Sequence, residues 1–146
     1  MIKNKHFSVL LTLPLLCINA CQANPSDFVV IFKCHSDTPT KIRVVVKEQK
    51  GLFELEQFSH SQFKHSMPEK VIAIGKFSYH RPLVTEHSME FKVGENKLTL
   101  SDYHSEELGM NIKEKSVTLV QGGKKEYWLC DDLSSSQLPS VDDFKK

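Results

Sequence analysis

The sequence has no excess of charge of either sign. Its 146 residues include 19 Lys and Arg against 18 Asp and Glu, a formal net charge of +1 at pH 7. Proteins that recognise nucleic acid through their electrostatic field usually carry a clear basic excess. Nucleic acid is therefore excluded as an expected partner. A composition of 40% hydrophobic and 25% charged residues is typical of one ordinary folded domain.

Motifs that specify a reaction or a cofactor are also missing. The sequence contains no phosphate-binding glycine loop, dinucleotide fingerprint, calcium loop, HExxH motif or GxSxG motif. Ser101, Asp102 and His104 are close neighbours in the chain, and such neighbours rarely converge into a catalytic triad. We therefore expect no catalytic residues, no cofactor and no enzyme activity.

Long apolar runs are absent except at the start of the chain. Lys3 and Lys5 precede an apolar stretch over residues 7–20, and small residues follow at 20–23. This stretch is shorter than the roughly twenty residues that a membrane-spanning helix needs, and Pro14 interrupts it. The three parts are typical of a secretory signal peptide, so we expect export.

Two processing routes remain open for this signal. Cleavage after Ala23 would release a soluble periplasmic or secreted domain. Alternatively, cleavage before Cys21 would leave a lipid on that cysteine, because residues 18–21 resemble the bacterial lipobox at the first, third and fourth positions. Asn19 departs from that pattern at the second position. The second route would anchor the protein to the outer or inner membrane, the one form of membrane contact that we expect.

Cysteine is scarce, and its positions are informative. Of the four cysteines, Cys17 and Cys21 lie in the signal region, which leaves Cys34 and Cys130 as possible partners. An oxidising compartment makes a disulfide between them the expected state. The pair lacks the nearby His or Cys that zinc sites show, so we expect no metal.

Alternation of apolar and polar residues with period two recurs through the rest of the chain and predicts strands. The apolar members of these strands are Phe28, Val30, Phe32, Ile42, Val44, Val46, Phe53, Leu55, Met89, Phe91, Val93, Leu98 and Leu100. Residues 71–79 are apolar on both faces, and Gly75 within them indicates a bulge. Turn residues separate the strands at 49–51 and 94–96, and Gly122-Gly123 predicts a two-residue hairpin turn.

Seven or eight short strands joined by tight turns predict an all-β fold. We expect a small antiparallel meander β-barrel closed by one disulfide, with a β-sandwich as the alternative. A single helical turn is expected near 105–110. We assign residues 1–23 to the signal peptide, 24–132 to a single β domain and 133–146 to a flexible C-terminal tail, since the tail lacks periodicity.

Two segments have the composition of recognition loops. Residues 57–70 and 80–88 mix aromatic, aliphatic and basic side chains, which interface centres favour. The candidate partner-binding residues are Phe58, Phe63, His65, Arg81 and Leu83. The alternative is that Phe58, Phe63 and Leu83 fill the barrel interior. Trp128 is expected to pack near the disulfide.

Six histidines remain after the signal: His35, His60, His65, His80, His87 and His104. Their spacing matches no metal-binding motif, and we expect them to be solvated loop residues. Below about pH 6 they would add positive charge, so binding to an acidic partner would strengthen with acidification.

The layout of the chain resembles a known family. Phe32-Lys33-Cys34 in the first strand and a closing cysteine in Tyr127-Trp128-Leu129-Cys130 are similar to the small exported bacterial barrels that include the periplasmic and membrane-bound inhibitors of C-type lysozyme. The Ser-Gly-rich inhibitor loop of those families is absent, so no inhibitory residue carries over. The resemblance implies an antiparallel β-barrel of the bacterial envelope that works by binding.

The sequence therefore predicts an exported, non-enzymatic binding module that recognises a protein or another envelope component, in an inhibitor-like manner if the resemblance holds. A first alternative is a carrier that holds a small apolar ligand inside the barrel. A second alternative is a metal-binding or hydrolytic periplasmic protein that uses its histidines.

Overall fold

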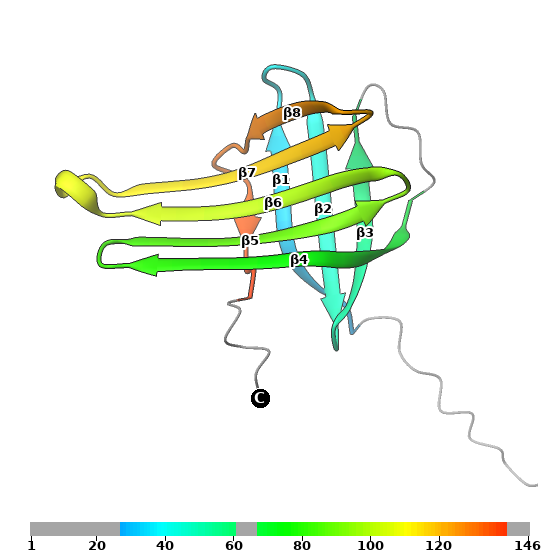
Figure 1. The fold of residues 1–146 in the computed structure, drawn as a ribbon, viewed down its shortest axis with the longest axis horizontal. Coiled ribbons are helices and arrows are strands. Elements are labelled where there is room, and N and C mark those ends of the chain that lie inside the picture. The colour runs from blue at the N-terminus through cyan, green and yellow to red at the C-terminus, as the bar shows by residue number, and fades with distance from the viewer. Residues whose placement is uncertain (1–26, 61–66, 140–146) are drawn as a thin grey trace, which may run out of the picture.

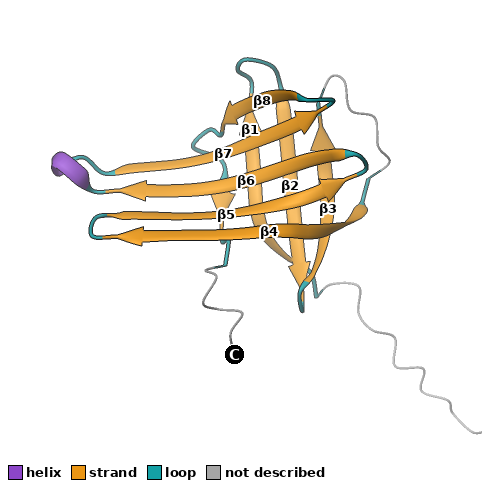
Figure 2. Ribbon diagram, in the orientation of Figure 1, coloured by secondary structure: helices purple, strands orange, loops and turns teal. Residues whose placement is uncertain are grey.

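The computed structural model describes residues 27–60 and 67–139, and almost all of its regular structure is β-sheet (Figures 1 and 2). One 3₁₀ turn, Glu107–Gly109, stands at the expected helical turn. The strands are β1 (Val29–Ser36), β2 (Ile42–Gln49), β3 (Leu52–Ser59), β4 (Glu69–Arg81), β5 (Val84–Val93), β6 (Asn96–Ser105), β7 (Ile112–Gln121), β8 (Lys124–Leu129) and β9 (Ser135–Ser136).

The strands form one antiparallel sheet in the order β8-β7-β6-β5-β4-β3-β2-β1-β9. Strands β1 to β8 are thus a meander in which each strand pairs with its neighbour in sequence. The sheet curls into a half-barrel, and β1, β2 and β3 cross behind β4 to β8 at a steep angle (Figure 1). The prediction of an all-β antiparallel meander is confirmed.

Alternating apolar residues make the core, as the sequence pattern predicts. Ile42, Val44 and Val46 on β2 are buried, while the residues between them are half-exposed. Phe53 and Phe91 meet edge to face with their ring centroids 5.3 Å apart. The largest fully buried side chains are Trp128, Phe32, Phe91, Ile42, Leu55, Met89, Leu98, Leu100 and Leu119.

Register shifts interrupt the pairing at three places, one of them between Val45 and Val46 in the pairing of β2 with β3. The register of β1 shifts between Val30 and Phe32, so Phe32 is buried and Val30 is exposed, and the expectation that both share one face is wrong. The bulge expected at Gly75 is confirmed by the register shift between Ala73 and Gly75 on β4. The second apolar face expected on β4 points to solvent, since Ile72 is 71% exposed.

Tight turns connect the meander where turn residues were expected. Gly122 and Gly123 join β7 to β8 with positive φ angles of 55° and 80°. Positive φ at both central residues is the requirement of a primed hairpin turn, which glycine meets without strain. The predicted hairpin is confirmed.

The half-barrel is closed by contacts between β1 and the segment after β8. Cys34 and Cys130 form the predicted disulfide, with 5.2 Å between their Cα atoms. Beside it, the Asp131 N–H donates a 2.8 Å hydrogen bond to the His35 carbonyl. Trp128 is buried in the same core cluster as Cys34 and donates from Nε1 to the Thr40 carbonyl at 3.1 Å. A disulfide of this kind indicates an oxidising location outside the cytoplasm.

The segment after the disulfide is ordered where it covers β1. Ser135 and Ser136 pair with Lys33 and Phe32, and Leu138 is buried. Residues 133–139, which the sequence assigns to a flexible tail, therefore include a short strand and a buried side chain. Backbone pairing along an edge strand needs no side-chain periodicity, which is why the pattern missed it. Residues 140–146 and the predicted signal peptide lie outside the described residues.

A short polar network attaches this segment to β1. His35 Nδ1 lies 2.5 Å from Asp131 Oδ2, and the Ser134 hydroxyl donates to Asp131 Oδ1 at 2.8 Å. The His35 N–H in turn donates to Ser134 Oγ at 2.9 Å. Burial acts to raise the pKa of Asp131, but the hydrogen bonds from Ser134 and His35 and the charge of His35 lower it below its usual value.

Removal of the disulfide should strongly destabilise the protein. The bridge joins residues 96 positions apart. Without the bridge, the free energy of unfolding should fall by roughly 4 to 5 kcal/mol, because the conformational entropy of the unfolded chain increases. Urea denaturation of the double variant Cys34→Ala/Cys130→Ala measures this loss. The native protein under reducing conditions should show a similar loss, and a decrease below about 1 kcal/mol would contradict the prediction.

Replacement of Asp131 should change how stability depends on pH. A lowered pKa means that the carboxylate stabilises the fold above its unfolded pKa of about 3.9, and that this contribution disappears as pH falls through the lower folded value. Asp131→Asn should therefore be less stable than the native protein near pH 7, and the difference should shrink in acid. Urea denaturation between about pH 3 and pH 7 tests this, with the exposed neighbour variant Asp132→Asn as control. A difference that is constant over this range would count against it.

Candidate functional site

The strongest candidate site lies on a part of the sheet that projects beyond the half-barrel. Strand β4 has 13 residues and β5, β6 and β7 have 10 each, whereas β1, β2 and β3 have eight. In Figure 1 the ends of the β4–β5 and β6–β7 hairpins extend to the left, past the crossing strands. We call this projection the arm and define it as residues 77–88 and 101–116.

The predicted recognition segments have separate positions in the fold. Residues 80–88 form the end of the β4–β5 hairpin, at the tip of the arm. Residues 57–70 are divided between the end of β3, the undescribed residues 61–66 and the start of β4. Phe63 and His65 lie outside the described residues, as does the candidate lipidation site Cys21.

The structure separates the remaining predicted binding residues. Phe58 is 5% exposed and belongs to the core, which confirms the alternative that it fills the interior. Leu83 is 58% exposed, so the same alternative is wrong for Leu83. Arg81 donates from Nη2 to Glu107 Oε2 at 2.9 Å and thereby connects the two hairpins of the arm. Arg81 and Leu83 therefore belong to one exposed surface, and Phe58 does not.

His60 differs from the expectation of a solvated histidine. Its side chain is 1% exposed, and its Nε2 lies 3.0 Å from Glu126 Oε2. Its ring meets Trp128 edge to face at 5.1 Å between centroids. Hydrogen bonds from Lys124 and the proximity of Lys124 and His60 lower the pKa of Glu126, although burial opposes the change. This pair connects the end of β3 to β8 and is part of the architecture.

Strand register divides the arm into two faces. The buried row Met89, Leu100 and Val117 marks where the barrel core ends, and the face that continues from it is called the inner face. Two transverse rows of side chains follow on this face, because residues two apart on a strand share a face. They are Ser78, His87, Asp102 and Lys115, and then His80, Thr85, His104 and Lys113.

The inner face changes abruptly from apolar to basic. Lys113 and Lys115 carry positive charge, and Asp102 is the acidic member of the two rows. His87 Nδ1 lies 2.9 Å from the Ser78 hydroxyl, and His104 Nε2 lies 3.6 Å from Glu106 Oε1. Four strands supply the histidines and lysines of this face, which are His80, His87, His104, Lys113 and Lys115. Only the strand register brings these side chains together.

Lys76 stands at the inner edge of this face, opposite Met89. Its ammonium lies 5.5 Å from the centroid of the Phe53 ring, a cation–π arrangement. Burial lowers the pKa of Lys76, and the charge of Glu48 opposes this change. Lys76 therefore extends the basic surface from the arm to the mouth of the barrel.

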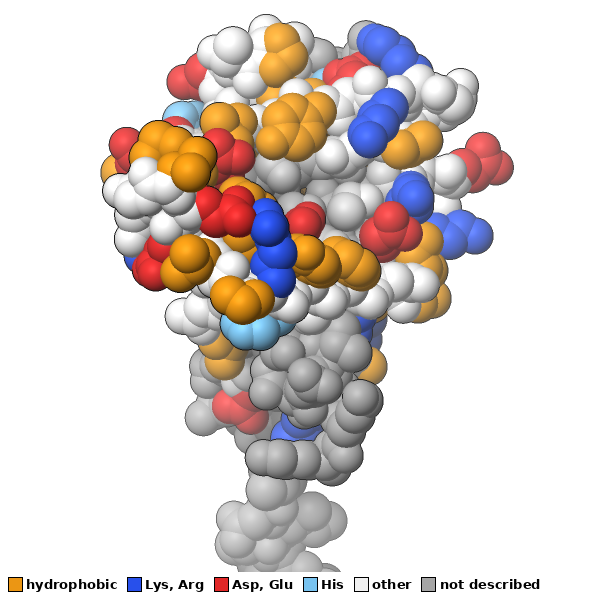
Figure 3. Space-filling model, turned by 60° about the vertical axis from the view of Figure 1, so that its left-hand side comes forward, with side chains coloured by type: hydrophobic (Ala, Val, Ile, Leu, Met, Phe, Trp, Pro, Cys, Tyr) orange, Lys and Arg blue, Asp and Glu red, His pale blue; other side chains and the backbone are white. Residues whose placement is uncertain are grey.

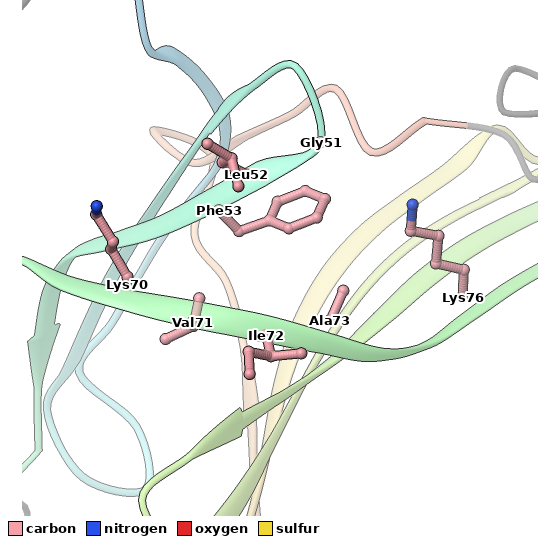
Figure 4. A pocket seen from close by; sticks show the side chains of 8 residues that line it. All are labelled: Gly51, Leu52, Phe53, Lys70, Val71, Ile72, Ala73 and Lys76. Carbon is pink, nitrogen blue, oxygen red and sulfur yellow. The ribbon is translucent and has the colours of Figure 1, made fainter.

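A cleft of about 530 Å³ opens beside Lys76, where β3 and β4 separate (Figure 4). Pairing between these strands covers only Phe53–Leu55 with Glu69–Val71. Apolar side chains line the middle of the cleft and a lysine stands at each end, Lys70 and Lys76. The barrel interior is filled by large buried side chains. A carried apolar ligand would therefore have to occupy this cleft rather than the interior.

The metal and hydrolytic alternatives both depend on groups of ionisable side chains. Residues 27–60 and 67–139 contain no group of three or more His, Cys, Asp or Glu side chains that could hold a metal ion. Ser101 faces the side of the sheet opposite to Asp102 and His104, because side chains alternate along β6. In the His35 network, the Ser134 hydroxyl donates its hydrogen bond to Asp131. In a catalytic triad the serine hydroxyl would donate to the histidine instead.

Comparison with known proteins yields no relative for this chain. No protein-family model, no curated protein and no solved structure matches it. Within the described part of the chain, no helix is long and apolar enough to cross a membrane.

Proposed function

We propose that this protein is an exported, non-enzymatic binding module that captures an acidic protein partner on the inner face of its arm. The observation that carries the proposal is the charge of that face. Its two rows and Lys76 contribute three lysines and three histidines, against one aspartate in the rows. Among the described residues, Glu106, 3.6 Å from His104, and Glu48, close to Lys76, also bring negative charge to this surface.

The shape of the arm supports protein capture. A projecting four-stranded sheet presents side chains from several strands at once, held by backbone pairing on a rigid barrel. Lysines in such an array attract an acidic surface and speed its association. Leu83 at the tip adds an exposed apolar contact. An inhibitor-like mode of binding is the form of this proposal that the layout resemblance implies.

Acidification should strengthen such binding. Histidine is the side chain whose protonation responds to pH near neutrality, and the inner face carries His80, His87 and His104. An acidic partner keeps most of its carboxylates ionised down to about pH 5. The attraction therefore increases over this interval.

Charge reversal on the inner face should strongly weaken capture of an acidic partner. Lys113→Glu/Lys115→Glu should weaken binding of poly-L-glutamate about tenfold or more at pH 5.5, because two attractive charges become repulsive. Fluorescence anisotropy measures the affinity. Lys33→Glu/Lys92→Glu makes the same change of net charge away from the arm and is the matched control.

Replacement of His80, His87 and His104 by Gln should remove the gain in affinity between pH 7.5 and pH 5.5. The same variants then test which proteins of an envelope extract the arm retains. An equal loss in the control variant, or a pH gain that survives without the three histidines, would refute the inner face as the site.

We further propose that the chain is exported through its N-terminal signal, and intact mass spectrometry tests this. Expressed with its own signal, the protein should have a mass that begins at Asn24 and that gains two hydrogens on reduction, which would mean a soluble periplasmic or secreted domain. A mass that begins at lipidated Cys21 would instead place it on a membrane surface, and Cys21→Ala should then remove the lipid. Retention of the full 146-residue mass would contradict export.

A further inference from the structure

We propose that the outer face of the sheet, where the arm leaves the barrel, carries a carbohydrate-binding furrow. This face lies opposite the basic inner face and is independent of the function proposed above. Its floor is the transverse row Ser88, Ser101 and Ser116, three short hydroxyl side chains on neighbouring strands.

Larger side chains border the floor on both sides. One bordering row contains Glu86, Tyr103 and Glu114, and the other contains Thr99, Thr118 and Tyr127. The difference in side-chain size leaves a shallow hollow of about 360 Å³. Figure 3 views the molecule from the arm side and shows a hollow bordered by hydrophobic and charged side chains.

The furrow is long enough for an extended ligand. Its floor row ends at Phe77 on β4 and at Leu129 on β8, both exposed. Five adjacent strands at the usual spacing make a surface roughly 19 Å across. A chain of sugar rings could therefore lie across the strands, in contact with several rows.

The chemistry of the furrow fits sugar rings. Tyrosine rings offer apolar faces to the C–H faces of a sugar, and their hydroxyl groups remain available for hydrogen bonds. Tyr127 is 51% exposed and stands two rows from Tyr103, so the tyrosines flank the floor at opposite corners. The serine hydroxyls and the carboxylates of Glu86 and Glu114 accept hydrogen bonds from ligand hydroxyl or amide groups.

Other ligand classes fit the furrow less well. Glu86 and Glu114 would repel an anion, and Lys125 is the one cation among the residues that line the hollow. A lipid chain would cover the serine hydroxyl groups of the floor without giving them hydrogen-bond partners, and burial of unpaired hydroxyl groups costs free energy. A neutral ligand rich in hydroxyl or acetamido groups satisfies the carboxylates, the hydroxyls and the aromatic faces together.

Isothermal titration of the mature protein with cellotetraose and with the β-1,4-linked tetramer of N-acetylglucosamine tests the furrow. At least one of these probes should bind, and Tyr103→Ala and Tyr127→Ala should each weaken that binding about tenfold. Leu52→Ala is the control, because Leu52 is an exposed apolar residue on β3, outside the five strands of the furrow. It should change the affinity less than about twofold.

A second measurement separates loss of contact from loss of fold. The aromatic NMR signals of Tyr127 should shift on titration of the native protein, and each variant should keep its native melting temperature. Lys113→Glu/Lys115→Glu should leave sugar binding unchanged, so failure of the furrow and failure of the inner-face proposal are distinguishable. Absence of binding to both tetramers, or effects of Tyr103→Ala and Tyr127→Ala no larger than that of Leu52→Ala, would overturn the furrow.

Discussion

The connection between β1 and the segment that follows β8 determines how the sheet closes. The meander of β1 to β8 begins and ends at different edges, and the Cys34–Cys130 bridge holds β1 against the end of β8. Around it, the His35–Asp131–Ser134 network and the β9 pairing cover the edge of β1. A covered edge is protected from pairing with other chains, so these contacts define the domain and also limit its aggregation.

The strands of the sheet differ in length, and this difference creates the arm. The core needs only the residues that face the short strands β1 to β3, and the remaining lengths of β4 to β7 extend past it. Within residues 27–60 and 67–139 no opposing layer buries the side chains of the arm, and its inner face changes from Leu and Val to Lys and His. The same rigid hydrogen-bonded sheet then serves as a platform with two chemically different faces, one basic and one rich in hydroxyl groups and tyrosines.

Sequence reasoning reached the fold class because period-two alternation and turn residues are local signals. It correctly predicted the buried faces of β2, β5 and β6 and the Gly122-Gly123 hairpin. It failed at Val30, where a bulge reverses the alternation, and it missed the short strand within residues 133–139, where backbone pairing gives no side-chain pattern. Arg81 and Leu83 were chosen from their composition, and both lie on the arm; Phe58, chosen in the same way, is in the core.

By itself, the sequence determined the β class, the disulfide partners and the approximate strands, because each depends on residues that are near in the chain or few in number. The tertiary structure alone decided the strand register, and register determines which side chains stand in one row. His80, His104 and Lys113 share a row although β4, β6 and β7 supply them, and Tyr103 and Tyr127 flank one hollow from β6 and β8. Such groupings depend on several turns and bulges in series, because each pairing sets the register of the next, and no single short stretch of sequence encodes the sum.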